Sequence, residues 1–285
     1  MCPQSGQWVY GTYFNSITNC RTGVFIGIGW VCLGENWLAL IFVALMQADI
    51  SPDTLSGLFM ASLVAYCALT LVFWVICRVM KLDRATFWAP LIFGNTGNLG
   101  LPLALFAFGE AGLSYAVIVF AVMAVGSFSV GVWMVSGGGS VTKIFKEPIS
   151  WATLAGALFL VMGWQTPMWL TNTLELTGQM AIPMMLITLG VALARLQVTT
   201  LSRAILLSVV KLAAAVVIAW VVGRWFGLND VAFGVLVVQI ATPVAVTSYL
   251  LAQKYGADAN EVAGLVIVST LLSVIALPVL LAILL

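Results

Sequence analysis

The sequence contains no histidine and very few charged residues. Of its 285 residues, 10 are Asp or Glu and 11 are Lys or Arg, so charged residues make up 7% of the chain, against roughly a quarter of a soluble domain. The lack of histidine excludes metal sites of the HExxH type and serine–histidine dyads. The scattered basic residues form no stripe that could follow a phosphate backbone, so we expect no nucleic acid as a partner.

Cysteine is scarce as well and is confined to the start of the chain. The five cysteines are Cys2, Cys20, Cys32, Cys67 and Cys77. None of them forms a CxxC pair, so the sequence predicts neither a zinc site nor a disulfide framework, and no cofactor or metal is expected. Every aspartate lies at or near a polar joint, whereas an intramembrane aspartyl protease needs two within the membrane. We therefore expect a protein that is not an enzyme.

Apolar residues dominate the composition instead. They make up 62% of the chain, and the mean hydropathy is +1.13. Runs of about 20 apolar residues, the length that spans a bilayer, recur between short polar joints and predict an all-α integral membrane protein. The nine predicted spans are residues 23–47, 55–79, 85–108, 112–135, 149–165, 178–194, 201–225, 229–252 and 261–285.

The chain shows weak internal similarity at an offset of 146 residues. Residues 55–105 align without a gap to residues 201–251, and twelve of the 51 positions are identical. The matches include Trp74 with Trp220 and Arg78 with Arg224. Because the second copy contains five spans, an odd number, the two copies would lie in opposite orientations across the membrane, which predicts an inverted repeat.

The first copy lacks one predicted helix. The partner of the span at 149–165 would fall near residues 3–19, which are polar and contain no apolar run long enough to cross a bilayer. We therefore expect residues 1–22 to be a divergent polar segment without a spanning helix, residues 23–148 to form the first repeat with four spans, and residues 149–285 to form the second repeat with five.

Basic residues predict the orientation. Successive joints between spans lie on alternate sides of the membrane, and the absent first helix is included in this count. Nearly all of the basic residues then lie in joints on one side, which makes that side cytoplasmic by the positive-inside rule. These residues are Arg78, Lys81, Arg84, Lys143, Lys146, Arg195, Arg203 and Lys254, whereas the other side receives Arg224. The expected location is the plasma (inner) membrane, with the C-terminus outside.

Two predicted spans are interrupted by helix-breaking residues. The first contains Gly94-Asn95-Thr96-Gly97-Asn98-Leu99-Gly100-Leu101-Pro102, and the second contains Gln239-Ile240-Ala241-Thr242-Pro243. Glycine and proline interrupt a helix, and broken backbone at membrane depth persists only where protein or a wet cavity satisfies the freed polar groups. The positive ends of such half-helices favour a carboxylate, so the two breaks predict a site for a small organic anion. The alternative is that these residues only kink two ordinary helices.

Lys211 lies near the centre of the span at 201–225. An unpaired cation at this depth costs about 2.5–3.5 kcal/mol on insertion scales, so the side chain needs a partner or a cavity. We expect it either to attract the anion or to bond to freed backbone carbonyls.

The ordered motifs LDRATFWAPLIFGNTGNLGLP and ATPVAVTSYLLAQKYGADANEVAGLVIVSTLLSVIALPVL resemble the auxin efflux carrier family. The resemblance covers roughly residues 38–285, and the bacterial members of this family include malonate and other organic-acid transporters. It implies ten helices in two inverted five-helix repeats, with the fourth and ninth crossing at the substrate site. It also implies a moving transport domain and a scaffold domain that forms homodimers. Residues 1 to about 36 show no likeness to the first helix of the family.

The sequence therefore predicts a secondary transporter that moves a small organic anion by alternating access. An anion channel remains an alternative because paired broken helices can also line a pore. A truncated and non-functional carrier is a further alternative because the first helix of the family is not recognised. The expected substrate-binding residues are Asn95, Thr96, Asn98, Pro102, Lys211, Gln239, Thr242, Pro243 and Thr247.

Overall fold

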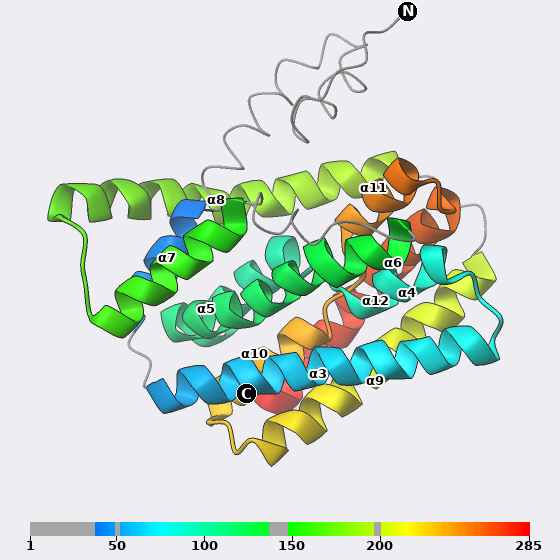
Figure 1. The fold of residues 1–285 in the computed structure, drawn as a ribbon, viewed down its shortest axis with the longest axis horizontal. Helices are drawn as coiled ribbons and strands as arrows, with labels where there is room; N and C mark the ends of the chain where they lie inside the picture. The colour runs from blue at the N-terminus through cyan, green and yellow to red at the C-terminus, as the bar shows by residue number, and fades with distance from the viewer. Residues whose placement is uncertain (1–37, 49–51, 137–147, 197–200) are drawn as a thin grey trace, which may run out of the picture.

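The structure is a computed structural model that describes residues 38–48, 52–136, 148–196 and 201–285. Within these ranges the regular structure is helical, apart from one isolated β-bridge between Gly94 and Val244. The long helices run roughly along the long axis of the molecule (Figure 1). The expected all-α fold is confirmed for this part of the chain. The polar segment at residues 1–22, most of the first predicted span and the joint at 137–147 lie outside the described residues.

The first half of the chain begins with a short helix at residues 38–46. The elements that follow are α3 (Pro52–Val79), α4 (Arg84–Ile92), the π-helical turn η1 (Thr96–Gly100), α5 (Leu101–Gly126), a second π-helical turn η2 (Ser127–Gly131) and α6 (Val132–Ser136). The elements of the second half are α7 (Pro148–Met162), α8 (Met168–Arg195), α9 (Leu201–Trp225), α10 (Asp230–Ile240), α11 (Val246–Tyr255) and α12 (Ala259–Leu284).

Five described stretches are long and apolar enough to cross a membrane. They are Asp53–Val79, Thr96–Ser136, Met168–Ala194, Leu201–Trp225 and Ala259–Leu284. The predicted spans at 85–108 and 229–252 do not appear as single helices, because each is divided into two half-helices by a break. The span predicted at 149–165 corresponds to α7, which has 15 residues.

The stretch Thr96–Ser136 reverses direction at Gly109. This glycine has φ 68° and ψ −160°, which lies outside the helical region and in backbone space that glycine adopts without strain. The chain folds back so closely that a Cβ added to Gly112 would lie 2.7 Å from the carbonyl oxygen of Ala104, eight residues earlier. The reversal separates the two arms of α5 where the sequence predicts a joint between the spans at 85–108 and 112–135.

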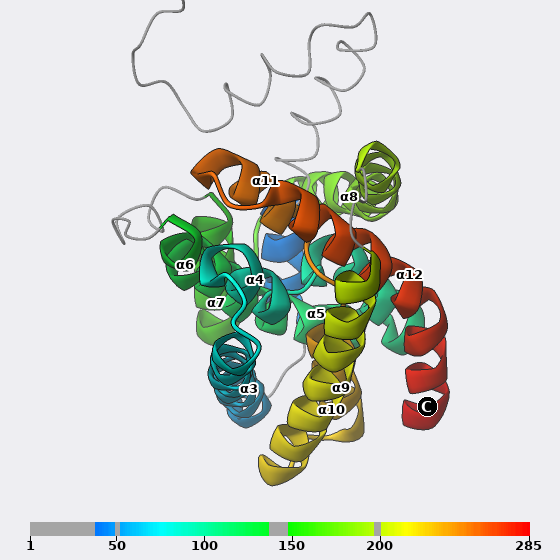
Figure 2. The ribbon, with the colours of Figure 1, turned by 90° about the vertical axis from the view of Figure 1, so that its right-hand side faces the viewer.

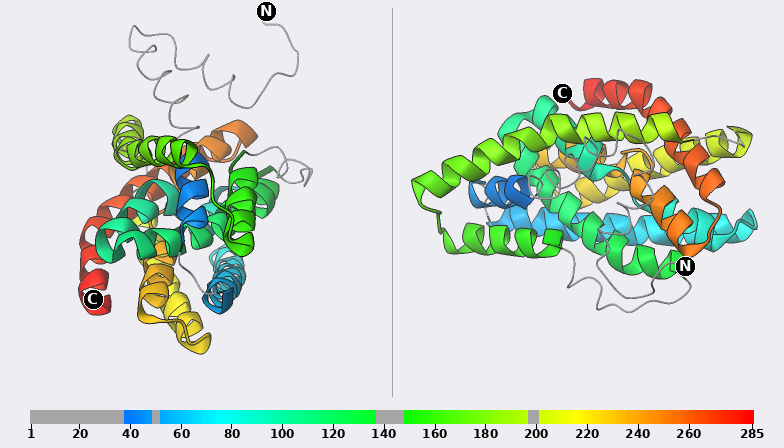
Figure 3. Two further views of the ribbon diagram at one scale, coloured as in Figure 1. Left: turned by 90° about the vertical axis from the view of Figure 1, so that its left-hand side faces the viewer. Right: turned by 90° about the horizontal axis from the view of Figure 1, so that it is seen from above.

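α5 lies in the middle of the bundle (Figures 2 and 3) and packs against α3, α7, α8 and α10. In its most apolar stretch 65% of the residues are buried, compared with 28–33% in the spans formed by α3, α8, α9 and α12. These outer helices expose large apolar side chains such as Leu71, Ile187, Val217 and Ile275. A surface of this kind fits lipid, because water would make such exposure unfavourable. The fold thus encloses the two broken helices within a lipid-compatible shell.

Candidate functional site

The candidate site is built from two interrupted helices. α4 ends at Ile92 and the chain becomes helical again at Thr96, while α10 ends at Ile240 and helix resumes at Val246. Both interruptions fall in the segments that the sequence predicts to be broken. In the first, the backbone at Phe93 is extended with ψ 116°. Each break leaves several N–H and C=O groups without intrahelical partners, and these groups need bonds elsewhere because they are buried.

The two breaks satisfy each other by pairing as short antiparallel strands. Gly94 and Val244 form the bridge, and the N–H of Asn95 donates to the carbonyl oxygen of Pro243 at 2.7 Å. The N–H of Ala245 donates to the carbonyl oxygen of Phe93 at 3.4 Å. Glycine is required at position 94, since a Cβ there would lie 2.3 Å from Thr242 Oγ1. The helices therefore cross in contact, backbone against backbone.

Two buried side chains bond to the second break. Lys211 of α9, 3% exposed, donates from Nζ to the carbonyl oxygen of Thr242 at 2.8 Å. Ser269 of α12 accepts a hydrogen bond from the N–H of Val244 at 3.0 Å through its Oγ. The bond from Lys211 corresponds to one of the two roles that the sequence suggests for this lysine, a bond to freed backbone carbonyls. Ser269 is not among the predicted residues, because no sequence signal distinguishes it from the other hydroxyls of its helix.

Several buried polar atoms around the crossing have no hydrogen-bond partner in the described part of the chain. They are Nδ2 of Asn95, Oγ1 of Thr96, and both Nε2 and Oε1 of Gln239. Gln239 packs directly on Gly100, where an added Cβ would lie 2.2 Å from Oε1. Leaving a buried donor or acceptor unpaired costs about 1–3 kcal/mol, so these atoms are poised to bond to a ligand or to water.

Helix N-termini at the crossing differ from those at the ends of the bundle. At the ends, side chains cap the helices: Asp83 accepts from the N–H of Thr86, and Asn229 accepts from the N–H of Ala232. At the crossing, neither η1 nor α11 has a side-chain cap. Uncapped N-termini present free N–H groups and the positive end of the helix dipole, which together bind anions.

The remaining predicted residues lie at varied distances from this buried group. Pro243 belongs to the bridge itself, and Pro102 is buried at the start of α5. Asn98 is only partly buried, and Thr247 is exposed on the first turn of α11. The structure therefore brings together Asn95, Thr96, Lys211, Gln239, Thr242 and Pro243 and leaves Asn98 and Thr247 at the margin.

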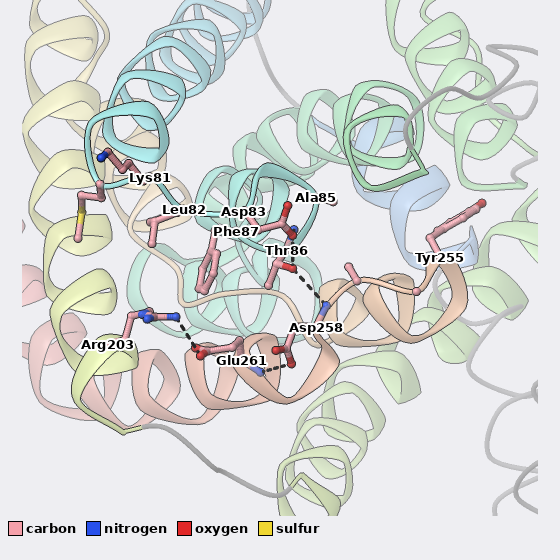
Figure 4. A pocket seen from close by; sticks show the side chains of 13 residues that line it. Lys81, Leu82, Asp83, Ala85, Thr86, Phe87, Arg203, Tyr255, Asp258 and Glu261 are labelled. Atoms are coloured by element: carbon pink, nitrogen blue, oxygen red, sulfur yellow. Dashed lines mark hydrogen bonds and ion pairs between the residues drawn. The ribbon is translucent and has the colours of Figure 1, made fainter.

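A separate cavity of about 540 Å³ lies at one end of the bundle, where the α3–α4 and α11–α12 joints meet the start of α9 (Figure 4). The Asp83 carboxylate accepts from Oγ1 of Thr86 at 2.6 Å, and the N–H of Asp258 donates to the same Oγ1 at 3.1 Å. Arg203 and Glu261 form an ion pair at 3.1 Å on the opposite wall. The bonds of Asp83, Asp258 and Glu261 tie the helix ends together, and these three carboxylates in the lining disfavour an anion in this cavity.

The described residues contain no group of three or more Cys, Asp or Glu side chains that could hold a metal ion. The chemistry available at the crossing is therefore hydrogen bonding and charge: one buried ammonium, amide and hydroxyl groups, and two uncapped helix ends. Such a set can bind and orient a small polar ligand.

Comparisons with known proteins agree with this geometry. Residues 132–281 match the model of a family described as "Membrane transport protein". An "Uncharacterized transporter" of Methanothermobacter thermautotrophicus is 27% identical over 252 residues, which cover 84% of this chain and 82% of that protein.

Two further relatives align over less of their length. A "Putative malonate transporter" of Rhizobium meliloti is 26% identical over 196 residues, or 64% of this chain and 61% of that protein. An uncharacterized transporter of Methanocaldococcus jannaschii is 26% identical over 197 residues, which cover 65% of this chain and 63% of that protein. The chain thus spans slightly less than two thirds of these two relatives. The family match, which covers more than half of the chain, and the broken helices lead to one conclusion: the chain belongs to the membrane transport protein family of the auxin efflux carriers.

Proposed function

We propose that this protein is a secondary transporter that moves a small organic anion, a carboxylate, across the membrane by alternating access. The observation that carries the proposal is the crossing of two interrupted helices at Gly94 and Val244, with unpartnered polar side chains buried beside it. Discontinuous helices that cross near the midplane are the usual location of transporter substrate sites.

The composition of the crossing favours an anion over a cation. Lys211 provides a buried positive charge, while residues 92–102 and 239–248 contain no acidic residue. Asn95 and Gln239 each offer an unpartnered amide nitrogen, and the uncapped ends of η1 and α11 add backbone N–H groups. Donors to a charged ligand give shorter and stronger hydrogen bonds than neutral pairs, so this site would select a carboxylate.

The relative named for malonate supports a dicarboxylate as the substrate. One carboxylate could bond to the amide nitrogens at the crossing while Lys211 compensates its charge. The second carboxylate would extend toward the partly buried Asn98. This arrangement assigns substrate contacts to Asn95, Thr96, Asn98, Lys211, Gln239 and Thr242, with Pro102 and Pro243 shaping the backbone and Thr247 at the margin.

The proposed architecture is two inverted repeats, residues 23–148 and 149–285, with about nine spans and a divergent segment at residues 1–22. Paired features at the offset of 146 support it. Lys81 and Gly227, which lie two residues after the ends of α3 and α9, both have positive φ values, of 52° and 61°. The basic joints would face the cytoplasm, the protein would lie in the plasma (inner) membrane with its C-terminus outside, and a homodimer would form through the scaffold helices.

Two measurements test the transport function. Thermal shift of the purified protein across mono- and dicarboxylates identifies the ligand, and counterflow in proteoliposomes distinguishes a carrier, whose flux saturates, from a channel, whose flux does not. Asn95→Ala should weaken binding of the best ligand by about ten- to hundredfold, equivalent to about 1.5–3 kcal/mol. Leu271→Ala is the control, since Leu271 is 65% exposed on the outer surface of α12 and is not among the residues that bond to the crossing.

Several results would contradict the proposal. Unchanged affinity in Asn95→Ala, Gln239→Ala and Thr242→Ala alike would place the substrate elsewhere. Flux that does not saturate would indicate a channel. For the orientation, single cysteines at Ser140 and Lys254 should react from the cytoplasmic side and one at Glu110 from outside; labelling of all three from one side would overturn the topology.

A further inference from the structure

Lys211 is a buried cation without an acidic partner in the described residues. It lies in the middle of α9, and its polar contact among the described residues is the carbonyl oxygen of Thr242. Glu110 lies just after the reversal within α5 and Glu175 lies within α8, whereas the other described acidic residues lie at helix ends. The ion pair that the described residues form joins Arg203 to Glu261. The charge of Lys211 is therefore balanced by backbone dipoles.

The carbonyl that Lys211 contacts lies where a small cation would otherwise bind. Thr242 follows the C-terminal end of α10, and the last carbonyls of a helix carry the negative end of its dipole. In transporters with broken helices, unwound carbonyls and half-helix C-termini are the groups that coordinate a coupling ion such as Na⁺. Here the ammonium group of Lys211, 2.8 Å away, takes that position.

The neighbouring carbonyls freed by the breaks are already bonded. That of Gln239 accepts from Oγ1 of Thr242 at 2.7 Å, and those of Phe93 and Pro243 accept the bonds of the bridge. Na⁺ needs several oxygen ligands at once, so the bonded carbonyls leave no ready cage beside the ammonium group. The crossing has thus no evident room for a cation in addition to Lys211.

One buried hydroxyl on the same face of α9 has no bond. Ser208 lies three residues before Lys211 on α9, and residues at this spacing share a helix face. Its Oγ is buried, with 1% of the residue exposed, and has no hydrogen-bond partner in the described part of the chain. In the first repeat, the residues that correspond to Ser208 and Lys211 at the offset of 146 are Ser62 and Ala65. Ser62 donates to the carbonyl oxygen of Leu58 at 2.7 Å and so has the bond that Ser208 lacks.

We infer that Lys211 is a resident cation: its ammonium group occupies the position of a coupling ion, so the substrate crosses without Na⁺ or K⁺ as a co-substrate. A second consequence follows for variants. Removal of the ammonium group leaves the carbonyl oxygen of Thr242 without its donor and vacates a volume on the face of α9 that also carries the unpartnered Oγ of Ser208. A small alkali cation can enter this volume together with water molecules that supply its further ligands. The transport statement rests on the proposed function, whereas the cation site of the variants does not.

The test compares wild type, Lys211→Ala and Lys211→Ser in NaCl, in KCl and in N-methylglucamine chloride at equal ionic strength, without substrate. Wild type should melt at the same temperature in all three salts. The two variants should melt lower in N-methylglucamine and recover by at least about 3 °C in NaCl, because a ligand that binds the folded state raises its stability. Lys211→Met, which fills the volume without a charge, should show no recovery.

Lys254→Ala is the matched control, because Lys254 is exposed at the end of α11 and its loss leaves the crossing intact. A melting temperature of folded Lys211→Ala and Lys211→Ser that does not depend on the cation would overturn the inference. So would stabilisation of wild type by Na⁺ relative to N-methylglucamine, a measurement that remains decisive even if a variant does not fold.

Uptake into proteoliposomes provides the second measurement. Wild type should transport its carboxylate equally in the three salts, and Lys211→Ala should regain uptake only with Na⁺. Uptake by wild type that requires Na⁺ would overturn the inference. If wild type binds and transports no carboxylate in any salt, the proposed function fails, while the melting experiment still decides whether Lys211 holds a cation position.

Discussion

The two helix breaks pair with one another through the same backbone geometry, but the surrounding helices support them differently. Behind the first break, the ring of Tyr66 stacks on Phe93 with centroids 6.2 Å apart. Behind the second, Lys211 and Ser269 bond directly to the backbone of Thr242 and Val244. At the offset of 146, the positions of Lys211 and Ser269 correspond to Ala65 and Met123, which are apolar and buried.

This difference teaches that similar folds in the two halves need not share their chemistry. An apolar wall holds one break by packing, so that side of the crossing carries no charge. The polar wall holds the other by hydrogen bonds and adds one positive charge. If the site binds an anion, the charge that attracts it comes from the second half of the chain alone.

The largest expected effect is from a change that separates the two breaks altogether. Gly94→Ala introduces a Cβ that would lie 2.3 Å from Thr242 Oγ1 and 3.1 Å from the Thr242 carbonyl oxygen. We expect a loss of about 1–3 kcal/mol in stability, as for other overpacked cores, and loss of transport because both breaks must shift. Thermal melting and uptake measure the two effects.

Gly190→Ala is the matched control for this change. Gly190 lies within α8, and a Cβ there meets nothing within 4 Å. Alanine in place of an open helical glycine should leave stability unchanged or raise it by up to about 1 kcal/mol. Equal effects of the two substitutions would show that the crossing is not a close contact.

Removal of the polar support on one side should have the next largest effect. Ser269→Ala leaves the buried N–H of Val244 without its acceptor, which should cost about 1–3 kcal/mol in stability. Ser273→Ala is the control, because Ser273 is equally buried on α12 but bonds only to the carbonyl oxygen of Thr270 in its own helix. Indistinguishable melting temperatures for the two variants would mean that Ser269 does not support the break.

The apolar support should tolerate loss of its polar atom. The hydroxyl of Tyr66 is buried and has no partner in the described residues, so Tyr66→Phe should keep the stacking on Phe93 and change stability by less than about 1 kcal/mol. Tyr66→Leu removes the ring pair and should cost about 0.5–1.5 kcal/mol more. A Tyr66→Phe variant that loses transport while remaining folded would give this wall a polar role and remove the contrast.

The smallest expected effect lies at the end of the bundle. The ion pair of Arg203 and Glu261 is half exposed on the arginine side, and exposed pairs contribute about 0.2–1 kcal/mol. Arg203→Ala should therefore lower the melting temperature by a few degrees at most, and less at high salt. Thr86→Ala removes the hydroxyl that bonds to both Asp83 and Asp258, and it should lower the melting temperature more than Arg203→Ala does. A larger decrease for Arg203→Ala would show that the ion pair, and not these hydrogen bonds, stabilises this joint.

The sequence predicts the helices and the two interrupted segments well, because apolar length and helix-breaking residues are local signals. The sequence predicts the start of α8 at residue 178, ten residues too late, because residues 168–177 are polar. The threonines of this polar stretch bond within the helix: Thr173 donates to the carbonyl oxygen of Trp169 and Thr177 to that of Thr173, both at 2.7 Å. Such bonds let a polar stretch remain helical.

The details of the crossing depend on contacts between distant segments, which a single sequence does not encode locally. The offset of 146 would match Gly94 with Ile240, whereas the structure pairs it with Val244, four residues later. The gapless alignment therefore does not predict which backbone groups meet. In the same way, nothing in α12 marks Ser269 as the acceptor for Val244, because that choice follows from how the helices pack.

The bridge between Gly94 and Val244 also restricts how the protein can move. Strand pairs exchange bonds in a fixed register, and a slip by one residue would leave the buried N–H of Asn95 and the carbonyl of Phe93 without partners inside the membrane. Sliding of one broken helix along the other is therefore unfavourable. Any motion that exposes the crossing to alternate sides must carry both breaks together, as one rigid unit whose hinges lie at its edges.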